Sequence, residues 1–87
     1  MIRIVIAEDQ GMLLGAMKSL LSMEEDIEVV GLAKNGEEAI DLVNELQPDI
    51  CIMDIEMPVK TGLDAAEALR GGECKIIILT TFARPGY

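Results

Sequence analysis

Acidic side chains that follow short apolar runs are the residues of this sequence best suited to do chemistry. Glu8 and Asp9 come directly after the run Ile2 to Ala7, and Asp54 comes directly after the run Ile50 to Met53. If these carboxylates meet, each pair about 4 Å apart costs about 4 kcal/mol at an effective dielectric near 20, so the cluster requires a cation or a raised pKa. Because the chain contains no histidine, the ligands would be oxygens, which favour a hard divalent ion, and Mg²⁺ fits best.

Such a site suits phosphoryl transfer to a carboxylate. A carboxylate beside Mg²⁺ can attack a phosphoryl group and form an acyl phosphate. Asp54 is the natural nucleophile because it ends a buried apolar run, and Glu8 and Asp9 would hold the metal directly or through water. The main-chain carbonyl of Glu56 can reach the same ion, and Thr80 offers a hydroxyl to the phosphoryl oxygens.

Each of these residues also has an ordinary structural interpretation, which the sequence leaves open. Asp9 could cap the helix that follows it, and Glu8 could be a solvated loop acid. Asp54 could stabilise the loop that contains Pro58, and Thr80 could be a strand residue with no ligand to contact. The functional interpretation is favoured because all four residues fall at one edge of the predicted sheet.

The elements that must position these residues follow from the spacing of apolar side chains. Four short runs rich in branched apolar residues predict strands over 2–7, 27–33, 50–53 and 75–79. Apolar residues three and four positions apart predict three helices, whose inward sides are Met12, Leu13, Ala16, Met17, Leu20 and Leu21, then Ala39, Ile40, Val43 and Leu46, then Leu63, Ala66 and Leu69. Asn35 and Glu38 predict a capping box at the start of the second helix, and Pro48 ends it. The third helix extends over 62–70 and ends at Gly71-Gly72.

The alternation of strands and helices predicts an α/β domain with a parallel sheet. If the sheet is doubly wound in the order 2-1-3-4, right-handed crossovers place the first helix on one face and the second and third on the other. Ligands of open parallel sheets bind beyond the carboxyl ends of the strands, where the strand order reverses. The first and third strands would be neighbours there, so Glu8, Asp9 and Asp54 would converge, with Thr80 after the fourth strand.

Composition excludes several classes of function for these 87 residues. Sixteen acidic against seven basic residues give a net charge of −9, which repels phosphate backbones and argues against nucleic-acid binding. Neither a secretory signal nor an apolar run of about 20 residues occurs, and Cys51 and Cys74 fit reduced cysteines packed beside apolar runs. We therefore expect a cytoplasmic protein with no membrane partner.

The predicted fold leaves part of the sheet uncovered. A helix is about 10 Å wide and strands are about 4.8 Å apart, so one helix covers about two strands. One face of a four-stranded sheet would therefore be half bare, and the fourth strand would be an open edge. We expect a fifth strand and further helices to be missing, and the 87-residue chain to self-associate or to be poorly stable.

Taken together, the motifs resemble the receiver domain of bacterial two-component response regulators. They are Glu8-Asp9 after Ile-Val-Ile-Ala, Ile52-Met53-Asp54-Ile55-Glu56-Met57-Pro58 followed by Thr61-Gly62, and Ile76-Ile77-Ile78-Leu79-Thr80-Thr81. The run from Leu79 to Tyr87 further resembles the NarL-like class, whose members carry a C-terminal helix-turn-helix DNA-binding domain. The resemblance implies the flavodoxin-like receiver fold with order 2-1-3-4, residues 1–87 being its N-terminal part, and any nucleic-acid contact would come from the domain beyond them.

The resemblance also implies a role for each site residue. Asp54 matches the phosphoacceptor, Glu8 and Asp9 match the acidic metal pair, Glu56 matches a main-chain metal ligand, and Thr80 matches the hydroxyl that moves toward the phosphoryl group. The implied donor is a phosphohistidine on a sensor histidine kinase, and the implied product is a phosphorylated regulator, not an enzyme. In the family's full-length form, phosphorylation favours dimerisation.

One feature of the family has no counterpart in these residues. Receiver domains use a lysine at the end of a fifth strand to pair with the phosphoryl group, together with an aromatic residue on that strand, and neither Lys60 nor Lys75 is at an equivalent position. We therefore expect these residues alone to bind Mg²⁺ and to phosphorylate poorly, and not to relay the signal to the usual output face.

Two other functions stay open. Aspartate-nucleophile phosphatases of the haloacid-dehalogenase type also use an Asp-x-acid motif with Mg²⁺, which Asp54-Ile55-Glu56 fits loosely, although those enzymes place the nucleophile on the first strand of their core. Alternatively, the chain is an interaction or dimerisation module that is not phosphorylated and pairs through its exposed fourth strand.

Overall fold

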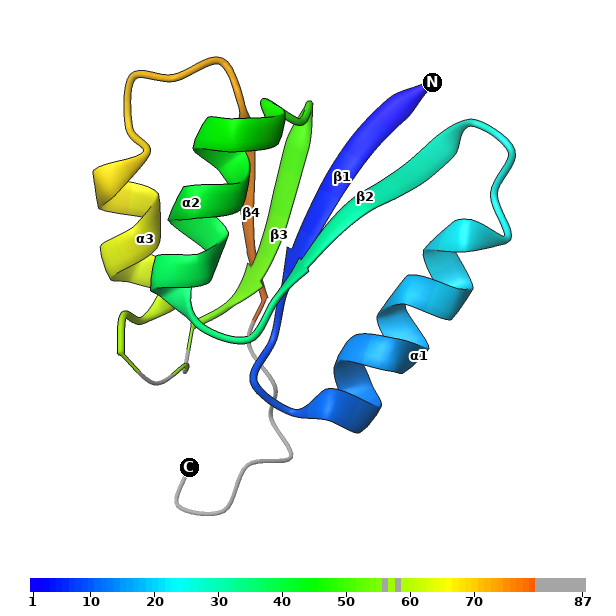
Figure 1. The fold of residues 1–87 in the computed structure, drawn as a ribbon, viewed down its shortest axis with the longest axis horizontal. Coiled ribbons are helices and arrows are strands. Elements are labelled where there is room, and N and C mark those ends of the chain that lie inside the picture. Colours follow the sequence, from blue (N-terminus) through cyan, green and yellow to red (C-terminus); the bar gives the residue numbers. More distant parts are fainter. Residues whose placement is uncertain (56, 58, 80–87) are drawn as a thin grey trace.

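A computed structural model describes residues 1–55, 57 and 59–79 of the chain. Strands and helices alternate along it, as the apolar spacing predicts (Figure 1). The strands are β1 (Ile2–Ala7), β2 (Ile27–Ala33), β3 (Ile50–Asp54) and β4 (Lys75–Leu79), and the helices are α1 (Gly11–Ser22), α2 (Gly36–Leu46) and α3 (Gly62–Ala68).

All four strands are parallel and lie in the order β2-β1-β3-β4, which confirms the predicted topology. β1 pairs with β2 on one side and with β3 on the other, so the strand order reverses between β1 and β3. The register aligns Ala7 with Met53 and Asp54 with Leu79. The carboxyl ends of β1, β3 and β4 therefore meet at one edge of the sheet.

The helices lie on the predicted faces of the sheet. α1 covers one face, where Ile4, Ile6 and Leu14 form a small core, and α2 and α3 cover the other (Figure 1). The larger core lies under α2 and α3 and consists of Val5, Ala7, Ala33, Ala39, Val43, Cys51, Met53, Met57 and Ala65. Alternate residues of β1 and β3 thus serve different cores, because successive side chains of a strand point to opposite faces. Both cysteines are free, and Cys51 is buried in the larger core.

Side-chain caps define two of the helix starts. Asn35 Oδ1 accepts a 2.8 Å hydrogen bond from the Glu38 N–H, as predicted, but the Glu38 carboxylate accepts from the N–H of Lys34 rather than from that of Asn35. At α3, Thr61 and Asp64 form a complete capping box, which was not among the predicted features. Both caps fix the direction in which a helix leaves the loop before it.

The sides that α1 and α3 present to the sheet differ in part from the prediction. Met12 is 93% exposed and Leu20 is 67% exposed, whereas Leu14, which was not in the predicted set, is buried. In α3, Leu63 is exposed and Ala65 is buried. Since α1 has apolar residues nearly all around and Lys18 as its one charged residue, its spacing could not identify the inward side.

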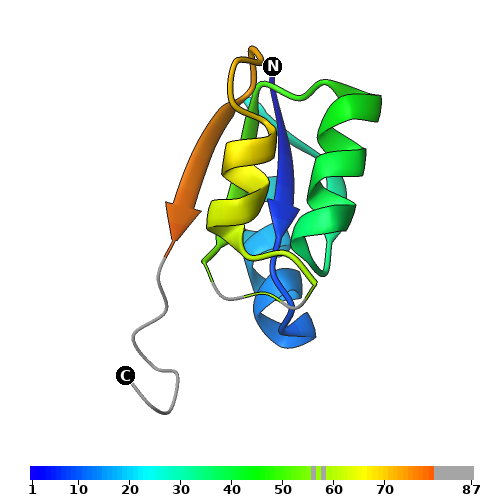
Figure 2. The same ribbon diagram turned by 90° about the vertical axis from the view of Figure 1, so that its left-hand side faces the viewer.

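β4 lies at the edge of the sheet, and within the described residues its only partner is β3 (Figure 2). Ile76 and Ile78 pack against the larger core, while Ile77 is 43% exposed and Leu79 is 40% exposed on the other face. The described chain thus has the half-bare sheet face that the widths of helices and strands predicted. None of the helices in this part of the chain has the length and apolar character that crossing a membrane requires.

Candidate functional site

The strand register places Glu8 beside Asp54. Ala7 is aligned with Met53, and the next residues are Glu8, which follows β1, and Asp54, which ends β3. The Glu8 N–H donates a 3.0 Å hydrogen bond to the Ala33 carbonyl, so the backbone at Glu8 still runs alongside β2. Neighbouring strands are about 4.8 Å apart, which brings the two side chains into direct proximity.

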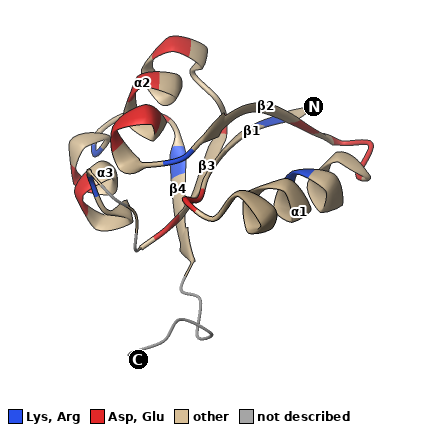
Figure 3. Ribbon diagram, turned by 60° about the horizontal axis from the view of Figure 1, so that its bottom comes forward, with Lys and Arg blue, Asp and Glu red and all other residues tan. Residues whose placement is uncertain are grey.

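Three carboxylates meet at this edge of the sheet. One carboxylate oxygen from each of Glu8, Asp9 and Asp54 lies within 4.8 Å of the others. Glu8 is 2% exposed and Asp54 is 3% exposed, while Asp9 is half-buried. Figure 3 shows acidic segments at this end of the sheet, beside the start of α1. This set of closely spaced oxygen ligands could hold a metal ion, and its chemistry is that of hard divalent cations.

Burial changes the acidity of Glu8. Removal from water raises the pKa of Glu8 from 4.5 to about 7. Burial is the largest cause of this raised pKa. Hydrogen bonds with the Asp9 and Asp54 side chains and the nearby Asp54 charge contribute in the same direction, while the Gln10 N–H, which donates to Glu8 Oε2 at 2.9 Å, acts in the opposite direction. Protonation of Glu8 lowers the repulsion among the three carboxylates, and a bound cation would lower it in the same way.

The backbone around Asp54 is held from two sides. The Ile55 N–H donates to the Leu79 carbonyl at 3.2 Å, and the Ile55 carbonyl accepts from the Gly62 N–H at 2.8 Å. A Cβ atom on Gly62 would lie 2.3 Å from the Asp54 carbonyl oxygen, so only glycine allows α3 to start this close to the carboxylate. From the sequence, Gly62 was a turn residue in the Thr61-Gly62 motif, and its close approach to the Asp54 carbonyl is visible only in the folded chain.

The structure decides between several of the alternative interpretations. The N-cap of α1 is Gln10, whose side chain makes no capping hydrogen bond, so the interpretation of Asp9 as the cap is wrong. Glu8 is buried and is not a solvated loop acid. The predicted roles of Glu56 and Thr80, and the loop residue Pro58, lie outside the described residues.

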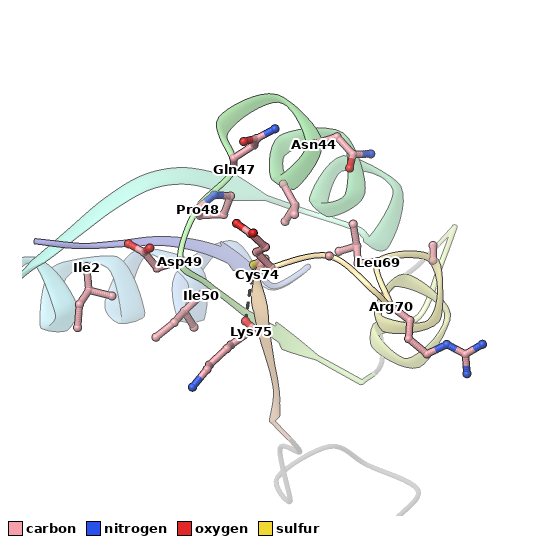
Figure 4. A pocket seen from close by; sticks show the side chains of 14 residues that line it. Ile2, Asn44, Gln47, Pro48, Asp49, Ile50, Leu69, Arg70, Cys74 and Lys75 are labelled. Carbon is pink, nitrogen blue, oxygen red and sulfur yellow. Dashed lines mark hydrogen bonds between the residues drawn. The ribbon is translucent and has the colours of Figure 1, made fainter.

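An open cavity of about 860 Å³ lies at the opposite end of the sheet (Figure 4). It is formed where β3 and β4 begin and where α2 and α3 end. Its polar residues include both acids and bases, and the Asp49 carboxylate already accepts a 2.8 Å hydrogen bond from the Arg3 N–H. None of the three clustered carboxylates lines it, and Lys75, at the start of β4, does. The cavity is therefore separate from the carboxylate cluster.

Comparison with known proteins places this arrangement in a known group. Residues 4–87 match the family described as Response regulator receiver domain. DesR, a transcriptional regulatory protein of Bacillus subtilis (strain 168), is 68% identical over 87 residues, which are 100% of this chain and 44% of DesR. The chain therefore spans less than half the length of this curated relative.

Solved structures match the fold closely. A DNA-binding response regulator of the LuxR family from Staphylococcus aureus superimposes with a TM-score of 0.89 at 43% identity, covering 100% of this chain and 74% of that one. The signal receiver domain of NarL from Mycobacterium tuberculosis gives a TM-score of 0.89 at 26% identity, covering 97% of this chain and 69% of that one.

Proposed function

This chain belongs to the response regulator receiver domain family, and on that premise we propose that Asp54 accepts a phosphoryl group from a sensor histidine kinase. The family and the LuxR and NarL neighbours agree with the resemblance that the motifs indicated. The observation that supports the proposal best is the meeting of three carboxylates within 4.8 Å at the end of a buried strand. A receiver domain is not itself an enzyme, so the phosphatase alternative has no support.

The proposed reaction is a displacement at phosphorus. A carboxylate oxygen of Asp54 attacks the phosphorus atom of the donor phosphohistidine and forms an oxygen–phosphorus bond. The phosphorus–nitrogen bond breaks, and its electron pair returns to the imidazole nitrogen of the kinase. The product is an aspartyl phosphate, an acyl phosphate whose formation requires mainly positioning and neutralisation of charge.

The acidic cluster fits Mg²⁺ in its donor atoms. Glu8, Asp9 and Asp54 would hold the ion, together with the main-chain carbonyl of Glu56, and the ion would neutralise negative charge on the phosphoryl oxygens. Glu8 and Asp9 would therefore bind and orient the metal ion, whereas Asp54 would react with the phosphoryl group. Thr80, which follows the edge strand β4, would offer its hydroxyl to the transferred group.

We propose that the kinase docks over the outer surface of α1. This helix starts beside the carboxylates, and Lys18 is its one charged residue. Met12 and Met23, near its two ends, are 93% and 78% exposed. Exposed apolar surface with flexible methionines is typical of a surface that binds another protein.

The output that we propose is transcriptional and is performed by a further domain. The similar proteins include a transcriptional regulatory protein and a DNA-binding response regulator. The net charge of −9 makes these 87 residues unsuited to contact DNA, so a helix-turn-helix domain beyond them would do so. Phosphorylation would promote self-association of the regulator, and we place the protein in the cytoplasm on its family alone.

Incubation with a small phosphodonor tests the phosphoacceptor. We expect acetyl phosphate and Mg²⁺ to add about 80 Da, one phosphoryl group, slowly and to a fraction of these 87 residues, because they lack a lysine to pair with the phosphoryl group, and to add nothing to an Asp54→Asn variant. Intact mass spectrometry measures the adduct, and cleavage by hydroxylamine distinguishes an acyl phosphate from a serine or threonine ester, which hydroxylamine leaves intact. Asp49→Asn is the matched control, since it removes one carboxylate at the other end of β3. A folded wild-type chain that takes up no phosphoryl group contradicts the proposal.

A further inference from the structure

The segment that joins β3 to α3 is held at several points. At its start, the Ile55 carbonyl accepts from the Gly62 N–H. At its end, the Thr61 hydroxyl accepts from the Asp64 N–H at 3.1 Å, and Asp64 Oδ2 accepts from the Thr61 N–H at 3.4 Å. Met57 is buried in the core between the sheet and the two helices. Contacts thus hold the described residues at the start, within and at the end of this segment.

A further contact comes from the first turn of α2. The Gly36 N–H donates a 3.0 Å hydrogen bond to the carbonyl of Lys60. A Cβ atom on Gly36 would lie 2.3 Å from this carbonyl oxygen and 2.7 Å from the Cβ of Lys60, so the two backbones touch. In Figure 1 the start of α2 lies beside the segment that leads into α3. Glycine is required here for space, because any side chain would displace Lys60.

The residue before this contact has a strained backbone. Val59 has φ = +69°, a left-handed conformation that a β-branched residue rarely adopts. For L-amino acids this conformation costs about 1–2 kcal/mol, and it persists only where neighbouring contacts impose it. The side chain of Val59 is 72% exposed and cannot supply that constraint. The constraint therefore comes from backbone contacts. The hydrogen bond from the Gly36 N–H to the carbonyl of Lys60, the residue that follows Val59, is the nearest of these contacts.

We propose that Gly36 is a positioning residue for the phosphoacceptor. Gly36 contacts Lys60 and so fixes the β3–α3 segment against α2. This contact sets the position of the backbone that follows Asp54, and the close approach of Gly62 to the Asp54 carbonyl sets the position of Asp54 itself. This inference rests on the proposed phosphorylation of Asp54. It adds that the first turn of α2, which contributes no carboxylate to the cluster, controls the geometry of the reaction.

The first test is Gly36→Ala. The new Cβ needs at least 3.4 Å where 2.3 Å is present, so the Lys60 carbonyl must move by about 1 Å. Displacements of this size at a reacting centre can cost about 100-fold in rate, and we expect phosphorylation by acetyl phosphate to slow by about 10- to 100-fold. The matched control is Gly15→Ala, because nothing lies within 4 Å of a Cβ at that position of α1. An unchanged rate in folded Gly36→Ala overturns the proposal.

A double variant separates positioning from stability. Gly36→Ala combined with Val59→Gly gives the segment the freedom to move away from the new methyl group, so the melting temperature should recover toward the wild-type value. The rate should stay low, because the segment is displaced. If rate and melting temperature recover together, Gly36 is only structural and the proposal fails.

A measurement on the metal-free chain needs neither phosphorylation nor Mg²⁺. Amide resonances of Ile55 and Gly62, which flank Asp54 and its loop, should shift in Gly36→Ala and stay unchanged in Gly15→Ala. In the wild-type chain, the Gly36 amide should be protected from hydrogen exchange, because it donates to the Lys60 carbonyl. Its resonance should shift in Asp54→Asn, because the segment that carries Lys60 starts at the end of β3.

Absence of both responses overturns the inference. If Gly36→Ala is too unstable to study, the spectra of wild type and Asp54→Asn decide alone, and an unshifted Gly36 amide overturns the inference. If these amide responses are present but the wild-type chain cannot be phosphorylated, the proposed function is refuted and the positioning role of Gly36 is not.

Discussion

At the scale of single residues, Glu8 stabilises the fold only while it is protonated. The pKa of Glu8 is raised from 4.5 to about 7, so the folded chain holds this proton more tightly than the unfolded chain does. The contribution of Glu8 to the free energy of unfolding of the metal-free chain should therefore be highest below pH 4.5. It should fall as the pH rises through 7, by about 3 kcal/mol in total.

Glu8→Gln tests this dependence, because glutamine keeps the shape and cannot ionise. We expect urea unfolding in EDTA, followed by circular dichroism, to show the variant more stable than wild type at pH 8 and nearly equal to it at pH 4. Glu45→Gln removes the same charge from an exposed position of α2 and should leave the pH dependence unchanged. A wild-type profile that is flat between pH 5 and 8 would contradict the prediction.

The sequence predicted the meeting of the carboxylates but not the close backbone contacts of the glycines, for a physical reason. Glu8, Asp9 and Asp54 follow apolar runs, and parallel strands bring such positions to one edge of the sheet. Gly36 and Gly62 matter because backbone atoms of other segments come within 2.3 Å of where their side chains would begin. That proximity is a property of the packed fold, and no local pattern indicates it.

At the scale of elements, the end of α2 carries a residue that does not suit its conformation. Gln47 is the C-cap and is left-handed, with φ = 48° and ψ = 60°. The carbonyls of Leu46 and Gln47 accept hydrogen bonds from Arg3 at 2.8 and 3.3 Å, so this helix end is already compensated by a cation. The remaining cost is the side chain of Gln47 in a conformation that favours glycine.

Gln47→Gly should therefore stabilise the chain by about 0.5–1 kcal/mol, since glycine adopts this conformation at little cost but gives more freedom to the unfolded state. Thermal unfolding should show a higher melting temperature than for wild type. Gln47→Ala removes the same side chain while keeping the left-handed cost, and it is the appropriate comparison. Equal or lower stability of the glycine variant relative to the alanine variant would be the contrary result.

Helices differ in how well the sequence predicted them, for a physical reason. α2 has acidic residues on one side and apolar residues on the other, so its inward residues Ala39 and Val43 were identified correctly. α1 is apolar nearly all around, so the prediction buried Met12 and missed Leu14. α3 ends at Ala68, and the prediction extended it to Arg70 because the glycines that follow were taken as its end.

At the scale of the whole molecule, the alternation of elements predicted the parallel sheet, the family resemblance supplied the strand order 2-1-3-4, and the handedness of the crossovers then placed the helices. Those rules apply to any parallel α/β sheet, so they hold even where individual inward residues were wrong. The β4 face was also anticipated, because it depends on the widths of helices and strands and not on side-chain detail. What the rules could not supply is the strained segment at Val59, which is imposed by contacts between elements.

The exposed face of β4 leads to a prediction about association. Ile77 and Leu79 are 43% and 40% exposed on an edge strand, whereas the net charge of −9 keeps copies of the chain apart. Salt screens that repulsion, so we expect light scattering after gel filtration to show a mass above the monomer that increases with chain and salt concentration. Ile77→Lys with Leu79→Lys should restore the monomer, whereas Met12→Lys with Met23→Lys, which adds the same charge on α1, should restore it less. Association that persists equally in both variants would place the contact elsewhere on the molecule.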